Sequence, residues 1–309
     1  MTDTQACSTW TLPPLGLGSW AFGGGYDWGP LDEPQAQRAV LCAWEQGITL
    51  IDTAPIYGDG QSELFLGRVL APLRARVRIA TKCGLVKQGS WPVHELHPKT
   101  LTKQLEDSLK RLQTDYIDLY QIHYPDPQIP LEDAVGELTR FQQAGKIRQI
   151  GLCNVTPQQI RTAAAVTPIF SVQNQYSLLR PAGQDVLQTC EALGIGFIGY
   201  GVLGGGILSG KYKREPNLRR ADARNYFYKC YRGEAFWHAQ QTAARVQQVA
   251  QQKGVAASAV ALAWALHKRG VNTVLFGARN PSQVQQNACA LHVMLTEDEI
   301  SFLGGASCL

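Results

Sequence analysis

Four side chains of this sequence are of the types that together move a proton: a carboxylate, a phenol, an ammonium group and an imidazole. Asp52, Lys82 and His123 each end a short apolar run, and Tyr57 follows Asp52 within the same segment. A buried lysine and a buried carboxylate are costly unless they pair, so an interior pair of this kind indicates a functional role. We expect Lys82 to stabilise the phenolate of Tyr57, lower its pKa from about 10 and make it a proton donor near neutral pH. Asp52 would hold Lys82, and His123 would orient a carbonyl oxygen by donating to it.

These residues stand in a repeat of short apolar segments and amphipathic segments. Leucines and valines recur at helical spacing within residues 101–112 and 131–138, and Gly47, Gly145 and Gly194 are placed to end helices just before a strand. Residues 204–237 predict a long functional loop, followed by helices over 238–253 and 256–268. The apolar segments predict strands at Leu15–Gly18, Thr49–Asp52, Val77–Lys82, Tyr116–Ile122, Ile147–Gly151, Ile169–Asn174, Ile195–Tyr200 and Thr273–Phe276.

Alternation of strand and helix indicates an α/β fold with parallel strands and right-handed crossovers. Eight such units fit a closed (β/α)8 TIM barrel better than an open doubly wound sheet, although the order of strands and helices alone leaves the open sheet possible. We expect a single domain over residues 1–309. In a parallel barrel the functional groups lie at the carboxyl ends of the strands. From the second strand to the eighth, the predicted strands carry or lead into polar residues, namely Asp52, Lys82, His123, Asn154, Gln173, Tyr200 and Arg279.

Composition narrows the class of protein. The 309 residues carry a formal net charge of +4 with 17% charged residues, which is too weak and too evenly spread to argue for nucleic acid. The first ten residues lack the pattern of a secretory signal, and no apolar stretch is long enough for a membrane span. The eight cysteines form no C-x-x-C pair, so we expect reduced thiols in a cytoplasmic protein and no metal site.

Segments from about residue 15 to residue 290 resemble the signature segments of the aldo-keto reductases, in the family's order. They include Asp-Thr-Ala-Pro-Ile-Tyr-Gly at 52–58, Ile-Ala-Thr-Lys at 79–82, Tyr-Ile-Asp-Leu-Tyr-Gln-Ile-His at 116–123, Ile-Gly-Leu-Cys-Asn at 150–154 and Gln-Asn-Gln-Tyr-Ser at 173–177. The bacterial branch related to potassium-channel β subunits is the most similar one.

The resemblance implies an NADPH-dependent oxidoreductase that reduces aldehydes or ketones to alcohols, on a barrel that binds the cofactor in extended form. It implies that Asp52, Tyr57, Lys82 and His123 are the catalytic tetrad, and that the protein is a monomer. Arg279 offers a bidentate fork for the cofactor's 2′-phosphate, which favours NADPH over NADH. The cofactor-binding residues that it implies are Cys153, Asn154, Gln173, Tyr200, Gly201, Leu203, Gly205, Lys211, Arg224, Gly277, Arg279, Gln283, Gln286 and Asn287.

Two segments depart from the family's pattern. Cys153 stands where the family usually has serine, and because a thiol is the weaker donor, cofactor affinity is expected to drop and oxidation to inhibit. Residues 200–203 read Tyr-Gly-Val-Leu where Tyr-Ser-Pro-Leu is usual, and three glycines follow, which predicts a looser pyrophosphate clamp. Two further motifs only resemble known signatures. G-x-G-x-x-G at 199–204 resembles the Rossmann fingerprint but is expected to be a backbone-amide cradle, and His94-Glu-Leu-His97 resembles a zinc-protease motif but is expected to be a surface loop.

The substrate side is less informative. Trp20, Trp91 and Tyr124 follow predicted strands and could form an apolar, aromatic pocket. Two alternatives stay open at this point. The first is a non-catalytic NADP-binding regulator like the channel β subunits, which carry asparagine where this chain has His123. The second is a sugar or alcohol dehydrogenase working in the oxidative direction, since the same residues serve both directions.

Overall fold

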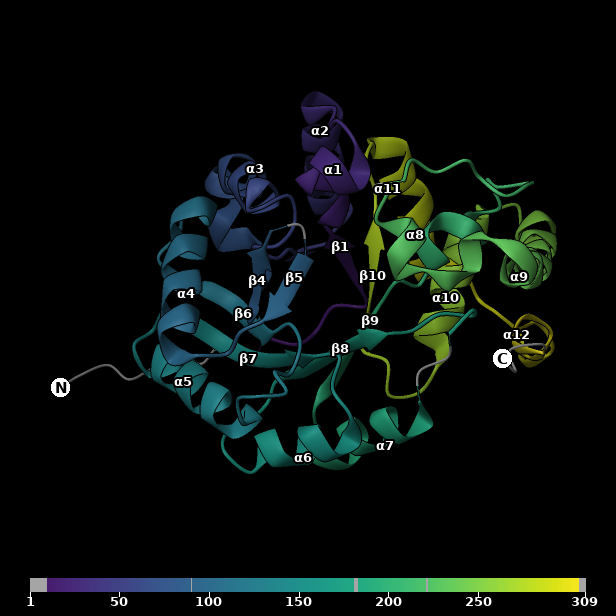
Figure 1. Cartoon of the computed structure of the whole chain (residues 1–309). Helices are drawn as coiled ribbons and strands as arrows, with labels where there is room; N and C mark the ends of the chain where they lie inside the picture. The colour runs from purple at the N-terminus through teal and green to yellow at the C-terminus, as the bar shows by residue number, and fades with distance from the viewer. Residues whose placement is uncertain (1–9, 90, 181–182, 221, 306–309) are drawn as a thin grey trace.

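Eight parallel strands close a barrel, which confirms the predicted fold class. The computed structural model describes residues 10–89, 91–180, 183–220 and 222–305. Each strand is hydrogen-bonded to two others, and the ring runs β1-β10-β9-β8-β7-β6-β3-β2 (Figure 1). The bounds are β1 Leu15–Gly18, β2 Leu50–Asp52, β3 Arg78–Cys83, β6 Ile117–Ile122, β7 Ile147–Cys153, β8 Ser171–Gln175, β9 Gly196–Tyr200 and β10 Thr273–Gly277.

Helices surround the barrel and follow the strands along the chain (Figure 1). The bounds are α1 Gly25–Trp28, α2 Glu33–Glu45, α3 Gln61–Leu70, α4 Pro98–Leu112, α5 Leu131–Gln143, α6 Pro157–Ala164, α7 Gln184–Leu193, α8 Arg224–Phe227, α9 Gly233–Lys253, α10 Ala257–His267, α11 Pro281–Ala288 and α12 Glu297–Gly304. Short 3-10 helices cover Trp20–Gly23, Ala71–Arg76, Gly204–Ser209, Lys229–Tyr231 and Cys289–His292. Over the described residues, no helix is long and apolar enough to cross a membrane.

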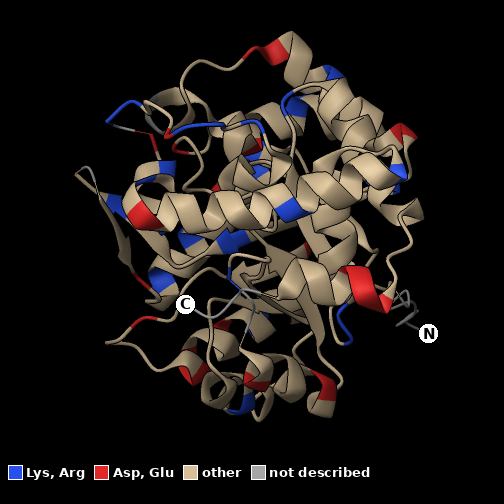
Figure 2. Cartoon of the chain, turned by 90° about the vertical axis from the view of Figure 1, so that its right-hand side faces the viewer, with Lys and Arg blue, Asp and Glu red and all other residues tan. Residues whose placement is uncertain are grey.

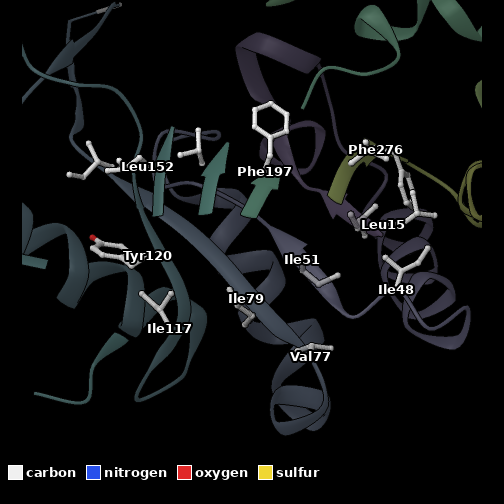
Figure 3. Packing of buried hydrophobic residues seen from close by; sticks show 14 of the residues in the cluster. Leu15, Ile48, Ile51, Val77, Ile79, Ile117, Tyr120, Leu152, Phe197 and Phe276 are labelled. Atoms are coloured by element: carbon white, nitrogen blue, oxygen red, sulfur yellow. The ribbon is translucent and has the colours of Figure 1, made fainter. Parts of the chain in front are cut away.

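Because successive side chains of a strand point to opposite faces, every second residue of each strand faces the barrel interior. The outward side chains pack with the helices in one large buried cluster (Figure 3). A second, small cluster fills the barrel interior with one residue from each of five strands, Leu50, Ala80, Leu119, Ile198 and Leu275. Two residues further along those strands the inward positions are Asp52, Lys82, Gln121, Tyr200 and Gly277. The fold therefore stacks a layer that includes the predicted polar residues on an apolar floor.

The predicted strands are confirmed, with bounds that differ from the observed ones by at most two residues. The helices at 101–112 and 131–138 are confirmed as parts of α4 and α5. Gly47, Gly145 and Gly194 have positive φ angles of 76°, 75° and 67° and follow the ends of α2, α5 and α7, as expected. The amino-terminal segment expected to lack a signal, with Cys7, lies outside the described residues except for Trp10, and Cys308 also lies outside them.

Two predictions about loops are wrong in part. The segment after β3, in which Trp91 was expected on a loop, contains an antiparallel hairpin of β4 (Leu85–Gln88) and β5 (Trp91–His94). Of the expected surface loop His94–His97, His94 ends β5, residues 95–96 are loop, and His97 is the N-cap of α4. The expected loop at 204–237 contains two 3-10 helices, α8 and the start of α9. Pro92 is compatible with its strand because β5 belongs to a two-stranded sheet, in which a missing N–H need not break a ladder.

Candidate active site

The four residues singled out as a proton-transfer set form one cluster at the mouth of the barrel. Lys82 Nζ donates to Asp52 Oδ1 at 2.6 Å and to the carbonyl oxygen of Thr53 at 2.9 Å, and it lies 3.4 Å from Tyr57 OH. The rings of Tyr57 and His123 meet edge to face with centroids 6.2 Å apart. Residues 71 positions apart in sequence thus face one another across three neighbouring strands and one loop.

The Asp52–Lys82 pair is almost completely buried, with side-chain exposures of 5% and 1%. Burial lowers the pKa of Lys82, but the negative charge of Asp52 and the contact with Tyr57 outweigh burial, so this pKa is raised above its usual value. Lys82 is therefore a permanent ammonium group near neutral pH. Its charge is neutralised on one side by the carboxylate and directed on the other side at the phenol.

The prediction of a lowered pKa for Tyr57 is wrong in its net direction. Burial raises the pKa of Tyr57 to about 12, and this exceeds the lowering that Lys82 produces. The charge of Lys82 can be anticipated from the sequence, whereas the loss of water around the phenol cannot. At neutral pH the phenol is protonated, so it has a proton to donate.

His123 is a neutral imidazole. Burial, with the positive charge of Lys82, holds the pKa of His123 well below its usual value. Its ring stacks on Tyr124 with centroids 5.3 Å apart, and Tyr124 stacks in turn on His94 of β5. A neutral imidazole keeps one N–H, which can donate to an oxygen placed between it and Tyr57.

Gln173 and Cys153 extend the buried layer around Asp52. Gln173 Nε2 donates to Asp52 Oδ2 at 2.8 Å, and Cys153 Sγ donates to Gln121 Oε1 at 3.6 Å. Cys153 is fully buried, and burial raises the pKa of its thiol. Because a buried, protonated thiol is a poor target for oxidants, the structure speaks against the expected oxidative inhibition. Gln121, which sequence reasoning missed, contacts three of these residues.

Asn154 and Tyr200 meet beside this layer. Asn154 has a left-handed backbone (φ 57°), which asparagine tolerates, and this turn directs its side chain back over the site. Its Nδ2 donates to the carbonyl oxygen of His123 at 2.9 Å, and its Oδ1 accepts from Tyr200 OH at 2.7 Å. The ring of Tyr200 lies next to Phe227, with centroids 6.1 Å apart.

The turn after β9 contains Gly201, Leu203 and Gly205, with Lys211 just beyond it. Gly204, Gly205 and Gly206 all have positive φ. The path of the turn is held by Gly204 N to Gly201 O at 2.8 Å, Gly206 N to Leu203 O at 2.9 Å and Tyr231 OH to Gly205 O at 2.6 Å. These hydrogen bonds argue against the looser clamp that was expected here. Lys211 is exposed, with Nζ 4.9 Å from the centroid of the Tyr212 ring.

Arg224, at the start of α8, is engaged within the protein. Its Nε and Nη2 bind Asp222 in a bidentate pair at 2.8 and 2.6 Å, and Nη1 donates to Tyr212 OH at 2.5 Å. Residues 211–232 contain eight basic and two acidic residues, a net +6 against +4 for the whole chain. The charge is therefore not evenly spread, although both signs mix over the helices on this side (Figure 2). The local excess suits phosphate groups.

The residues expected at the adenosine end gather where β10 leads into α11. Arg279 is partly buried, its Nη2 donates to the carbonyl oxygen of Pro30 at 2.7 Å, and its N–H donates to Gln283 Oε1 at 2.8 Å. Gly277 and Gln286 are exposed, whereas Asn287 is buried with 4% exposure. Within the part of the chain that the structure describes, Arg279 therefore keeps most of its guanidinium donors. Asn287 is the least accessible residue of this group.

Aromatic side chains border the mouth. The ring of Trp20 stacks near Tyr57 with centroids 6.0 Å apart and meets Phe227 of α8 edge to face at 5.0 Å. Trp91 on β5 is 67% exposed and meets Tyr226 of α8 edge to face. The expected pocket residues thus lie around the site, but Trp91 is at its outer rim. Phe227 was missed, because its helix lies inside the segment expected as a loop.

Two turns at this mouth touch backbone to backbone. The turn that carries Trp20 ends at Gly23, and the loop that carries Tyr57 continues to Gly58, which has φ 62°. A Cβ atom placed on Gly58 would lie 2.1 Å from Gly23 O, which is too close for any residue other than glycine. The two turns therefore pack with no side chain between them.

The chain belongs to the aldo/keto reductase family: the family's sequence model matches residues 14–306. The fold, the tetrad geometry and this match agree. Members of the family use nicotinamide cofactors and act on small carbonyl compounds, so the chain is an oxidoreductase of this family.

Named relatives span several activities. The chain is 37% identical to aldo-keto reductase YhdN of Bacillus subtilis over 88% of this chain and 82% of the relative. It is 32% identical to the NADH-specific methylglyoxal reductase of Escherichia coli over 95% and 94%. Among solved structures, a glycerol dehydrogenase from Gluconobacter oxydans superposes with a TM-score of 0.86 at 33% identity, covering 95% of this chain and 91% of that one.

The residues at the mouth fit a nicotinamide. Both hydrogens of Gln173 Nε2 are used, by Asp52 Oδ2 and Gln121 Oε1, whereas no donor in the described part of the chain reaches Gln173 Oε1. That oxygen, on a residue with 3% exposure, is an acceptor left for a carboxamide. The ring of Tyr200 offers a flat face beside it.

Proposed function

We propose that this protein is an NADPH-dependent reductase of aldehydes or ketones, with Tyr57 as the proton donor. The observation that carries the proposal is the position of Lys82, which touches Asp52 and Tyr57 at once. A structural ion pair would not need a phenol beside it. A bound reduced nicotinamide would supply the hydride, held by Gln173, Asn154 and Tyr200.

Each tetrad residue then has one task. Tyr57 OH and the N–H of His123 hold the carbonyl oxygen of the substrate, and Tyr57 gives up its proton as charge develops on that oxygen. An alkoxide is a stronger base than a phenolate, so a phenol with a pKa of about 12 can protonate it. Lys82 stabilises the resulting phenolate, and Asp52 keeps Lys82 in place.

The proposal is tested by purified protein, NADPH and a panel of aromatic and aliphatic aldehydes, ketones and sugars, with NADPH oxidation as the readout. Turnover of any carbonyl supports a reductase. Tight NADPH binding with no turnover of the whole panel in either direction would favour the non-catalytic regulator. Turnover only with alcohols and NADP would favour a dehydrogenase, an alternative that the likeness to a glycerol dehydrogenase keeps open.

The preference for NADPH rests on Arg279, because among the described residues only the carbonyl oxygen of Pro30 takes a guanidinium donor, which leaves the others for a 2′-phosphate. Replacing Arg279 with alanine is expected to weaken NADPH binding by about 10- to 100-fold, the value of one or two charge-assisted hydrogen bonds. NADH binding is expected to stay within about twofold of the unmutated protein. Titration of both cofactors, followed by protein fluorescence, measures this.

The control for this change is Arg269→Ala, since Arg269 is an exposed arginine paired with Glu191 on the outer helices. Equal affinity of the unmutated protein for NADPH and NADH would contradict the preference. The preference would also be contradicted if Arg279→Ala lost as much affinity for NADH as for NADPH. Tighter binding of NADH than of NADPH would be the result that resembles the NADH-specific relative.

The pKa of Tyr57 predicts opposite pH dependences for the two directions. Reduction needs the protonated phenol, which persists up to a pKa of about 12, so its rate is expected to stay flat from about pH 7 to pH 10. Oxidation needs the phenolate and is expected to rise about tenfold per pH unit over the same range. Initial rates with one aldehyde and its alcohol measure both. A reduction rate that falls with a midpoint near pH 8 would show that the phenol is more acidic than its burial indicates.

A further inference from the structure

We propose that Gln121 is a positioning residue of this active site, which links the tetrad carboxylate of Asp52 to the amide of Gln173. The inference rests on the proposed function for its kinetic readout, and on cofactor binding for a second, independent one. Neither the family match nor the relatives assign a role to this residue.

The position of Gln121 follows from strand alternation on β6. Leu119 belongs to the apolar floor of the barrel, and Gln121 is the next inward residue, with no exposed surface. A polar side chain of this size is not kept in a barrel interior without partners, because an unpaired buried amide costs about 1 to 3 kcal/mol. Its partners therefore explain its presence.

All three partners of the Gln121 amide lie at the tetrad or the expected cofactor site. Its Nε2 donates to Asp52 Oδ2 at 3.3 Å, and its Oε1 accepts from Gln173 Nε2 at 3.3 Å and from Cys153 Sγ at 3.6 Å. A flipped amide would place an oxygen against the carboxylate and a donor against two other donors. The charge of Asp52 therefore determines the orientation of this amide.

This arrangement holds both oxygens of Asp52. Lys82 binds Oδ1, while Gln173 and Gln121 bind Oδ2. A carboxylate held at both oxygens cannot rotate, so Lys82 Nζ stays within reach of Tyr57 OH. Gln121 Oε1 accepts one hydrogen of Gln173 Nε2, and Asp52 Oδ2 accepts the other. Gln173 Oε1 is therefore the atom of this side chain for which the described residues supply no donor. Gln121 thus orients the Asp52 carboxylate, which holds Lys82 near Tyr57, and also the Gln173 amide, which would hold the cofactor.

Replacing Gln121 with leucine keeps the volume and removes the donor and both acceptor contacts. We expect kcat for carbonyl reduction to fall at least about tenfold while the KM of the carbonyl stays within about threefold. NADPH binding should weaken at least about threefold, since the Gln173 amide loses a partner.

The matched control is Tyr120→Phe, on the same strand but in the outward cluster of the large core. It is expected to leave kcat, the KM of the carbonyl and NADPH affinity unchanged. If Gln121→Leu keeps the kcat and the NADPH affinity of the unmutated protein, the proposal is wrong. If its activity falls only in proportion to the folded fraction, with unchanged NADPH affinity, the residue is merely structural and the proposal is also wrong.

The second readout separates this inference from the proposed function. If the unmutated protein binds NADPH but reduces no carbonyl, the proposed function fails. The comparison of NADPH affinities between Gln121→Leu and Tyr120→Phe then still decides whether Gln121 orients Gln173. A loss of affinity confined to Gln121→Leu supports the link, and equal affinities overturn it.

Discussion

Replacing Tyr57 with phenylalanine is expected to lower kcat for carbonyl reduction by about 10²- to 10⁴-fold, the usual contribution of a positioned proton donor. The ring stays, and with it the contacts to Trp20 and His123 at 6.0 and 6.2 Å between centroids. Only the hydroxyl that lies 3.4 Å from Lys82 Nζ is lost. NADPH affinity and the free energy of unfolding are therefore expected to remain close to those of the unmutated protein.

Steady-state rates, NADPH titration and urea unfolding of the same preparation measure these three quantities. Tyr120→Phe removes a hydroxyl from a buried tyrosine of the outward core and serves as the control. If Tyr57→Phe keeps most of the activity, the proton donor is another group, and His123 would be the next to change. If it loses NADPH binding together with activity, the hydroxyl is part of the cofactor site.

Replacing Lys82 with methionine is expected to be the most damaging single change to stability. It leaves the Asp52 carboxylate almost completely buried without its counter-charge, which typically costs about 3 to 5 kcal/mol. Activity is expected to be lost as well, because nothing then stabilises the phenolate of Tyr57. Urea unfolding gives the free energy, and kinetics on the folded fraction give the rate.

Two comparisons isolate the buried charge. Lys103→Met breaks an exposed ion pair with Asp107 and is expected to cost less than about 1 kcal/mol. The double variant Lys82→Met/Asp52→Leu removes both charges and is expected to recover part of the stability lost in the single variant, while staying inactive. If the single and double variants are equally stable, the carboxylate is not strained by losing its partner, and the ion pair is less important for folding than its burial suggests.

The strands, and the clustering of Asp52, Tyr57, Lys82 and His123, could be predicted because each depends on a local pattern. Short, largely apolar runs that lead into a polar side chain indicate where a strand lies and at which of its ends functional groups are expected. In a closed parallel barrel all such ends meet at one rim, so local signals at Asp52, Lys82 and His123 were enough to place three residues in one cluster.

What could not be predicted depends on burial and on contacts between distant segments. The pKa of Tyr57 is set mainly by lost solvent, which no spacing reveals. The hairpin β4–β5 was missed because Pro92 reads as a strand breaker, and α8 because its four residues are too short for periodicity. Gln121 carried a usable signal, since it lies two residues before His123 and hence on the same face of the strand.

The contact between Gly23 and Gly58 gives the two walls of the site different freedom to change. Beside Trp20, the turn that ends at Gly23 meets the loop of Tyr57 through main-chain atoms at Gly58, so a side chain at Gly58 would force the two segments apart. A second part of the rim, where Trp91 and Tyr226 meet, is exposed and formed by contacts between side chains. Under the proposed function, we therefore expect substitutions at Trp91 and Tyr226 to change the substrate range more readily than substitutions at Gly58, which would displace Trp20 from Tyr57. That division suits a family whose members are named for substrates as different as methylglyoxal and glycerol.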